Sequence, residues 1–438
     1  MGETEMAGSI VIILLVLVFL GIPVAAVLGV LSLVLDLLYQ EGRLSVALGE
    51  FVWDKSKEFI LVAIPMFILL GEIMLRAGIA QRMYNAVIQW VSWLPGGLMH
   101  ANIGSCAIFA ASSGSSVATA ATVGTVAYPE IKKRNYNEPL FLGTLAAGGT
   151  LGILIPPSIN LIIYGLITDT SVPELYLAGI FPGLMLAGMF MIAVIIACIA
   201  RKSWGGTAIE TSWSERIRTL PDLLPPVLLF VVIVGSIYAG IATPTEAASV
   251  GVVFALGLAA LNRTLSINML REAFEGTMRT TAMIMLIILA AIFLNFILGF
   301  MGVTQALIKF ISDLGLTPLQ TMGLLVVFYL ILGMFMETLS MMLTTVPIVF
   351  PIVVALGYDP VWFGITLTVL MEAALITPPI GVNLYVVQGI RQDGGNFNDV
   401  ALGALPFVLM MIVLVVLLIA YPDIALYLPT EVYRGGYN

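Results

Sequence analysis

The fold is decided by a stretch with two adjacent prolines, Thr150-Leu151-Gly152-Ile153-Leu154-Ile155-Pro156-Pro157-Ser158, and by its counterpart, Glu372-Ala373-Ala374-Leu375-Ile376-Thr377-Pro378-Pro379-Ile380. Each stretch interrupts a long apolar run, over residues 140–167 and 361–390. A proline pair removes two amide donors and frees carbonyls on the preceding turn. One such pair is usually a kink, but two at matching places inside apolar runs indicate a binding site that broken helices create.

The spacing around these prolines repeats along the chain. Pro129 precedes Pro156 by 27 residues, and Pro351 precedes Pro378 by 27 residues, so the halves are offset by 222 residues. The segment Gly78-Ile79-Ala80-Gln81 also matches Gly302-Val303-Thr304-Gln305 at an offset of 224. A near-constant offset indicates a duplicated unit. We predict that residues 1–218 form a first repeat with its linker and that residues 219–438 form the second.

The composition places the chain in a membrane. Of its 438 residues 60% are apolar and 10% are charged, against roughly 25% charged in soluble proteins. One soluble core stops growing beyond about 250–300 residues, so membrane lipid must cover the remaining apolar surface. With a net charge of -8 the chain offers no basic patch to a phosphate backbone, which excludes nucleic-acid binding. The fold class that follows is an all-α polytopic membrane protein.

Charge fixes the relative orientation of the two halves. The loop after Pro129 holds Lys132, Lys133 and Arg134, whereas the loop after Pro351 holds only Asp359. The excess of Lys and Arg in cytoplasmic loops places these two loops on opposite faces of the membrane. If the other loops alternate between the two sides from there, 13 of the Lys and Arg residues lie on the cytoplasmic side and five lie outside. Both termini then lie outside as well. The repeat is therefore predicted to have inverted topology.

A run of serines predicts a hairpin in the first repeat. Ser112-Ser113-Gly114-Ser115-Ser116 interrupts the apolar region 98–129, and each arm is too short to cross a bilayer. A re-entrant hairpin whose tip lies at membrane depth must line a cavity or be buried in protein. Such a tip offers oxygens to a monovalent cation and a helix N-terminus to a carboxylate. The alternative is one straight helix with a small-residue packing surface. We expect a second hairpin over residues 318–351.

The remaining polar residues divide between function and structure. Glu337 and Glu372 are expected inside the membrane, where carboxylates are costly and usually functional. Thr243-Pro244-Thr245-Glu246 instead predicts a helix capping box. Ser115 has no plausible general base, because the only histidine is His100. Neither HExxH nor a Walker A motif occurs. We therefore predict that the chain is not an enzyme and that an ion gradient, rather than ATP, drives it.

Together these features resemble the large membrane subunit of a tripartite ATP-independent periplasmic (TRAP) transporter. The resemblance covers essentially the whole chain and implies an inverted repeat with a scaffold and a mobile, elevator-like domain that carries both hairpins. The residues that carry it are Ser113-Gly114-Ser115-Ser116-Val117-Ala118-Thr119-Ala120, Gly149-Thr150-Leu151-Gly152-Ile153-Leu154-Ile155-Pro156-Pro157-Ser158, Thr243-Pro244-Thr245-Glu246-Ala247-Ala248 and Ile376-Thr377-Pro378-Pro379-Ile380-Gly381-Val382-Asn383.

The resemblance also implies a function. It predicts a sodium-driven symporter that imports a small organic acid across the bacterial inner membrane, with both termini periplasmic. The expected partners are a small membrane subunit and a soluble periplasmic substrate-binding protein. Sodium ions would be the coupling ions, and no cofactor is expected.

The family's sites transfer to particular residues of this chain. The first sodium site would comprise Ser113, Ser116, Gly152, Ile155 and Pro157. The second would comprise Gly333, Ala374, Thr377 and Ile380, although the family usually has glycine where Ala374 stands. The resemblance places the substrate between the two hairpin tips, near Ser115, Thr338 and Asn383.

Three other functions remain open from the sequence. The nearest is a stand-alone sodium-coupled di- or tricarboxylate carrier that needs no binding protein. A passive channel is disfavoured by the two hairpins and two broken helices, which can occlude a site from both sides. A membrane hydrolase would have to use Ser115 as its nucleophile.

Overall fold

The computed structural model describes residues 22–207, 209, 211–391 and 393–435 together with residues 13, 16, 17 and 20, and it describes only the backbone of residues 111–113, 304, 307 and 310–312. The first half of the chain contains α2 (Val24–Gln40), α3 (Leu48–Ser56), α4 (Ala63–Arg76), α5 (Ile79–Val91), α6 (Leu98–Ser113), α7 (Ser116–Ala127), α8 (Glu130–Lys133), α9 (Glu138–Thr150), α10 (Ile159–Thr168), α11 (Val172–Ala200) and α12 (Trp213–Thr219). The second contains α13 (Leu224–Tyr238), α14 (Pro244–Leu261), α15 (Ile267–Phe300), α16 (Val303–Asp313), α17 (Pro318–Gly333), α18 (Thr338–Ala355), α19 (Pro360–Leu375), α20 (Val382–Ile390), α21 (Phe397–Ala420) and α22 (Asp423–Val432).

The lengths of these helices confirm a polytopic membrane protein. Within the described residues, seven helical segments are long and apolar enough to cross a bilayer: Phe59–Arg76, Val172–Ala200, Trp213–Tyr238, Pro244–Leu261, Ile267–Phe300, Thr338–Ala355 and Phe397–Ala420. Shorter apolar helices include one arm of each predicted hairpin and one half of each predicted broken helix. A half-helix that stops inside the membrane leaves backbone groups to be satisfied by protein or ligand.

Both predicted hairpins are present. α6 ends at Ser113, and Gly114 turns the chain with a left-handed φ of 58°, which glycine adopts without a steric penalty. Ser115 then caps α7 by accepting a hydrogen bond from the amide of Ala118 at 3.4 Å. The straight-helix alternative is therefore wrong. In the second repeat α17 and α18 form the corresponding hairpin, and Glu337 is the N-cap of α18.

Both predicted broken helices are also present. α9 stops at Thr150, and α10 begins only at Ile159, where Ser158 accepts a hydrogen bond from the amide of Leu161. α19 stops at Leu375, and α20 begins only at Val382. Each gap contains the proline pair, and both Pro–Pro bonds are cis. The breaks occur there because proline cannot donate the next helical hydrogen bond.

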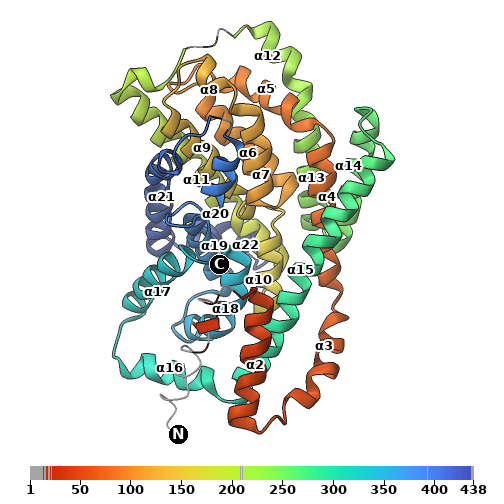
Figure 1. Ribbon diagram of the computed structural model, residues 1–438, viewed down its shortest axis with the longest axis vertical. Helices are drawn as coiled ribbons and strands as arrows, with labels where there is room; N and C mark the ends of the chain where they lie inside the picture. The colour runs from red at the N-terminus through yellow and green to blue at the C-terminus, as the bar shows by residue number, and fades with distance from the viewer. Residues whose placement is uncertain are drawn as a thin grey trace.

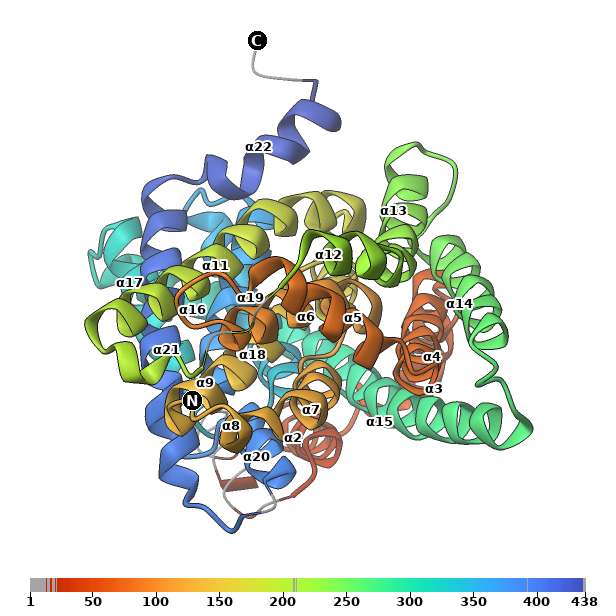
Figure 2. The ribbon, with the colours of Figure 1, turned by 90° about the horizontal axis from the view of Figure 1, so that it is seen from above.

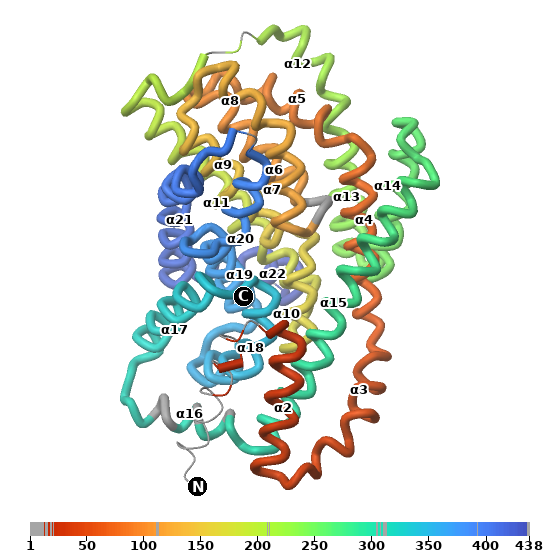
Figure 3. Tube along the Cα trace, in the orientation of Figure 1, coloured from red at the N-terminus to blue at the C-terminus, as the bar shows by residue number. Residues whose placement is uncertain are grey.

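The two repeats enter the membrane in opposite directions. Figure 1 shows α5 and α8 at the upper end of the molecule and α16 at the lower end, and the trace in Figure 3 follows the same path. α5 and α16 begin in the two segments that match at the offset of 224 residues. Equivalent parts of the two repeats therefore lie at opposite ends, as inverted topology requires.

The helices form two groups. α4 packs against α14 and α15, and α13 packs against α14; these helices gather at one side in Figure 2. The hairpins and broken helices form the second group, in which α9 of the first repeat packs closely against α21 of the second. A Cβ atom at Gly143 would overlap the carbonyl of Gly403, so the two backbones touch where both residues are glycine.

Candidate functional site

A cavity of about 160 Å³ lies between the two hairpin tips and the helices α4 and α15. Three helices begin at its wall: α7 with Ser115–Ala118, α10 with Ile159 and Asn160, and α18 with Glu337–Leu339. The first amides of a helix have no carbonyl partner within the helix, and the helix dipole gives that end a partial positive charge. The wall of the cavity thus favours an anion without using a cationic side chain.

The charged residues of the wall are acidic. The described residues that line the cavity include Glu72 and Glu337 but no lysine, arginine or histidine. Glu72 forms an ion pair with Arg76 one turn later on α4. Glu337 accepts hydrogen bonds from the hydroxyl of Thr338 at 3.1 Å and from the amide of Ser340 at 3.2 Å. Both carboxylates therefore have partners within their own helices.

The first predicted cation site comes together around the first tip. An added Cβ at Gly152 would lie 2.8 Å from the carbonyl oxygen of Ser115, and one at Gly114 would lie 3.1 Å from that of Pro157. The tip and the first break are thus in direct contact. Ser116 and Ile155 are buried beside them, whereas the side chain of Ser113 lies outside the described residues. Carbonyl and hydroxyl oxygens of this kind suit a hard cation.

The second predicted cation site is more open. A Cβ at Gly333 would overlap that of Ala374, so the second hairpin touches α19 at this point. Thr377 donates its hydroxyl hydrogen to the carbonyl of Ala373 at 2.6 Å, which leaves its lone pairs for a cation. Ile380 lies beyond the proline pair and is 39% exposed. The contacts thus join Gly333 to Ala374 and leave the role of Ile380 a prediction.

The structure separates the predicted substrate residues. Ser115 and Thr338, from the two tips, line the same cavity. Asn383 does not line it: this side chain is fully buried, and its amide nitrogen donates to the carbonyl of Ala146 at 3.2 Å. A substrate contact by Asn383 stays a prediction. Glu372 is likewise fully buried away from the cavity, and neither of its carboxylate oxygens has a hydrogen-bond partner among the described residues.

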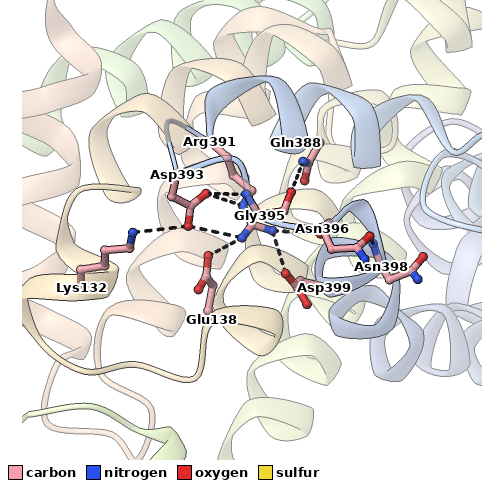
Figure 4. A network of polar contacts seen from close by, with 9 residues as sticks. All are labelled: Lys132, Glu138, Gln388, Arg391, Asp393, Gly395, Asn396, Asn398 and Asp399. Carbon is pink, nitrogen blue, oxygen red and sulfur yellow. Dashed lines mark hydrogen bonds and ion pairs between the residues drawn. The ribbon is translucent and has the colours of Figure 1, made fainter.

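Two polar features were not predicted from the sequence, one a single residue and the other a cluster. The first is Asn160, which lines the cavity; the only signal for it is one amide in the apolar run that follows Ser158. The second is a cluster around Arg391, which lies between α20 and α21 (Figure 4). The Arg391 side chain is 2% exposed. Its guanidinium lies 2.7 Å from Glu138, 3.0 Å from Asp393 and 3.1 Å from Asp399.

Glu246 has the structural role that the sequence predicts. Its carboxylate accepts the amide hydrogen of Thr243 at 2.8 Å, and its own amide donates to the Thr243 hydroxyl at 3.3 Å. These two reciprocal bonds form the capping box at the start of α14. Glu246 is therefore excluded from the cavity and from the candidate ion sites.

Comparison with known sequences identifies the family. Residues 11–424 match the family model described as "Tripartite ATP-independent periplasmic transporter, DctM component". The chain belongs to the DctM family. The "C4-dicarboxylate TRAP transporter large permease protein DctM" of Vibrio cholerae is 32% identical, over 97% of this chain and 98% of that protein. The "Ectoine/5-hydroxyectoine TRAP transporter large permease protein UehC" of Ruegeria pomeroyi is also 32% identical, with the same coverage.

The solved structure of another transporter supports the fold of this DctM-family chain. The YdaH transporter of Alcanivorax borkumensis aligns with a TM-score of 0.62 over 94% of this chain and 99% of that one, at 14% identity. That transporter has been described as having an unusual topology. The curated DctM-family relatives are named as permeases, which agrees with the prediction of a transporter component rather than an enzyme.

Proposed function

We propose that this DctM-family permease is a sodium-driven symporter that imports a small organic acid across the bacterial inner membrane. The observation that carries the proposal is the meeting of two re-entrant tips at one cavity, with a broken helix in contact with each hairpin. Half-helices of this kind supply amides for an anionic substrate and carbonyls for sodium. The hairpins and broken helices would move as one elevator domain against α4, α14 and α15.

The proposed partners follow from the family. The family description names a tripartite periplasmic transporter, which supports a complex of this large permease with a small membrane subunit and a periplasmic substrate-binding protein. The family membership favours this arrangement over a stand-alone carrier. The binding protein would deliver substrate at the face that carries α3 and α16, which becomes the periplasmic face if the Lys132 loop is cytoplasmic.

The test is uptake into proteoliposomes that contain the chain and its small subunit. Radiolabelled succinate, ectoine and γ-aminobutyrate are each supplied with the binding protein, with an inward sodium gradient and with the gradient collapsed by an ionophore. We expect uptake of at least one solute, at least tenfold faster with both the gradient and the binding protein. Uptake of free solute at the full rate without the binding protein would instead identify a stand-alone carrier.

A further inference from the structure

The side-chain amide nitrogen of Asn160 is a buried donor at the wall of the cavity. Its side chain is 4% exposed, it lines the cavity, and its Nδ2 atom has no hydrogen-bond partner in the described structure. A buried N–H donor without an acceptor is costly, so protein interiors rarely keep one. This donor is therefore suited to an acceptor on a bound solute.

The two helices that begin beside Asn160 have uncharged caps. Ser115 caps α7, and Ser158 caps α10 while donating its own hydroxyl hydrogen to the carbonyl of Ile153 at 2.5 Å. A serine cap satisfies one amide and adds no negative charge. The partial positive charge of both helix starts thus remains available, and together with Asn160 it favours a carboxylate at this end of the cavity.

The third helix start is different, because α18 supplies its own carboxylate. Glu337 accepts hydrogen bonds from Thr338 and Ser340, so the positive end of α18 already faces a negative charge. A second solute carboxylate placed there would meet Glu337 with no lysine or arginine among the described lining residues. Two carboxylates that share one site repel each other. An N–H donor that carries positive charge would instead be attracted.

We propose that Asn160 is a substrate-contacting residue and that the cavity selects a zwitterion, with a carboxylate toward α7 and α10 and an ammonium or amidinium group toward Glu337. This inference rests on the proposed transport function and names its substrate class. A volume of about 160 Å³ corresponds to roughly five waters at ~30 Å³ each. A small amino acid or a cyclic amidine with one carboxylate fits that space.

The test compares probes of matched size on the complex of this chain and its small subunit in lipid nanodiscs with sodium present. Succinate and γ-aminobutyrate have the same chain length and differ in one terminal group, and ectoine adds a cyclic amidinium. We expect at least one zwitterion to bind at least tenfold more tightly than succinate. Equal or tighter binding of succinate, or no binding of either zwitterion, would overturn the assignment.

Two variants test which end of the cavity binds the carboxylate of the solute and which end binds its cationic group. Asn160→Ala removes the donor and should weaken binding of the preferred zwitterion about tenfold, whereas Asn85→Ala on α5, outside the cavity, should not change it. Glu337→Gln keeps an acceptor for the Ser340 amide and should reduce the preference over succinate to less than about threefold. Unchanged affinity in Asn160→Ala, or unchanged preference in Glu337→Gln, contradicts the proposal. Thermal stabilisation by sodium reports that each variant is folded.

The proposed symport function and the proposed substrate class can fail independently. If a sodium gradient drives uptake of succinate but not of the zwitterions, the substrate class is wrong and the symport function stands. If uptake of a bound zwitterion does not depend on sodium, the symport function is wrong and the substrate class stands.

Discussion

At the scale of single residues, the hydroxyls at the two candidate cation sites can be tested directly. A sodium ion stripped of water is held by several oxygens, so loss of one hydroxyl should weaken its site by ~1–3 kcal/mol rather than abolish it. We expect Ser116→Ala and Thr377→Ala each to raise the sodium concentration for half-maximal uptake about tenfold. Wild-type sodium dependence in both variants would remove these residues from the sites. Their membrane levels should equal that of wild type.

Arg391 is a buried charge on which stability should depend. Its buried guanidinium is shared by Glu138, Asp393 and Asp399, and removing it would leave three carboxylates close together. Because the carboxylates are partly exposed, we expect Arg391→Ala to cost ~2–3 kcal/mol rather than the full value for a buried pair. The midpoint of thermal unfolding in detergent measures this loss. Arg271→Ala is the control, since that guanidinium is 75% exposed and its removal should leave the midpoint unchanged.

The same cluster predicts a pH dependence. Arg391 donates a hydrogen bond to Asp393 and holds the pKa of that carboxyl well below its usual range. A lowered pKa adds stability above the unfolded value of about 3.9, and this stability is lost as the pH falls toward the folded value. We expect Asp393→Asn to lower the unfolding midpoint equally at pH 8 and pH 5, and by less below pH 4. A difference that grows with acidification would contradict this assignment.

At the scale of helices, the contact between α9 and α21 holds the two repeats together. A methyl group at Gly143 or Gly403 would overlap the backbone of the facing helix. Overpacking of this kind typically costs ~1–3 kcal/mol, so we expect Gly143→Ala and Gly403→Ala to lower the unfolding midpoint. The matched control is Gly188→Ala on α11, where no atom lies within 4 Å of an added Cβ. This change should preserve or raise the midpoint, because alanine is the better helix former.

At the scale of the whole molecule, the inverted repeat predicts which loops share a face. Cysteines that replace Lys133, which is 66% exposed, and Arg43, which is 77% exposed, should be labelled from opposite sides by an impermeant thiol reagent. A cysteine at Ala355, at the end of α18, should react from the same side as position 43. The native Cys106 and Cys198 are buried and should not be labelled by the reagent. Labelling of positions 133 and 355 from one side would rule out the inversion.

The sequence by itself determined where helices stop and start. The first hairpin was predicted over residues 98–129, and α6 and α7 extend from Leu98 to Ala127; the second broken helix was predicted over residues 361–390, and α19 and α20 extend from Pro360 to Ile390. Proline pairs, glycines and capping side chains act within about four residues of the chain, so their effects can be read without knowledge of the fold.

Only the tertiary structure decided which polar residues share a site. Ser115 and Thr338 line one cavity, whereas the side chain of Asn383 donates a hydrogen bond to the carbonyl of Ala146. Asn160 also lines the cavity, although no sequence motif marks it. Arg391 meets Glu138 across 253 residues of sequence. The face that each half-helix presents depends on how it packs against the other repeat, and that packing is set by close contacts such as Gly143 with Gly403. Local sequence patterns carry no information about such distant pairs, because their members act on each other only after the chain has folded.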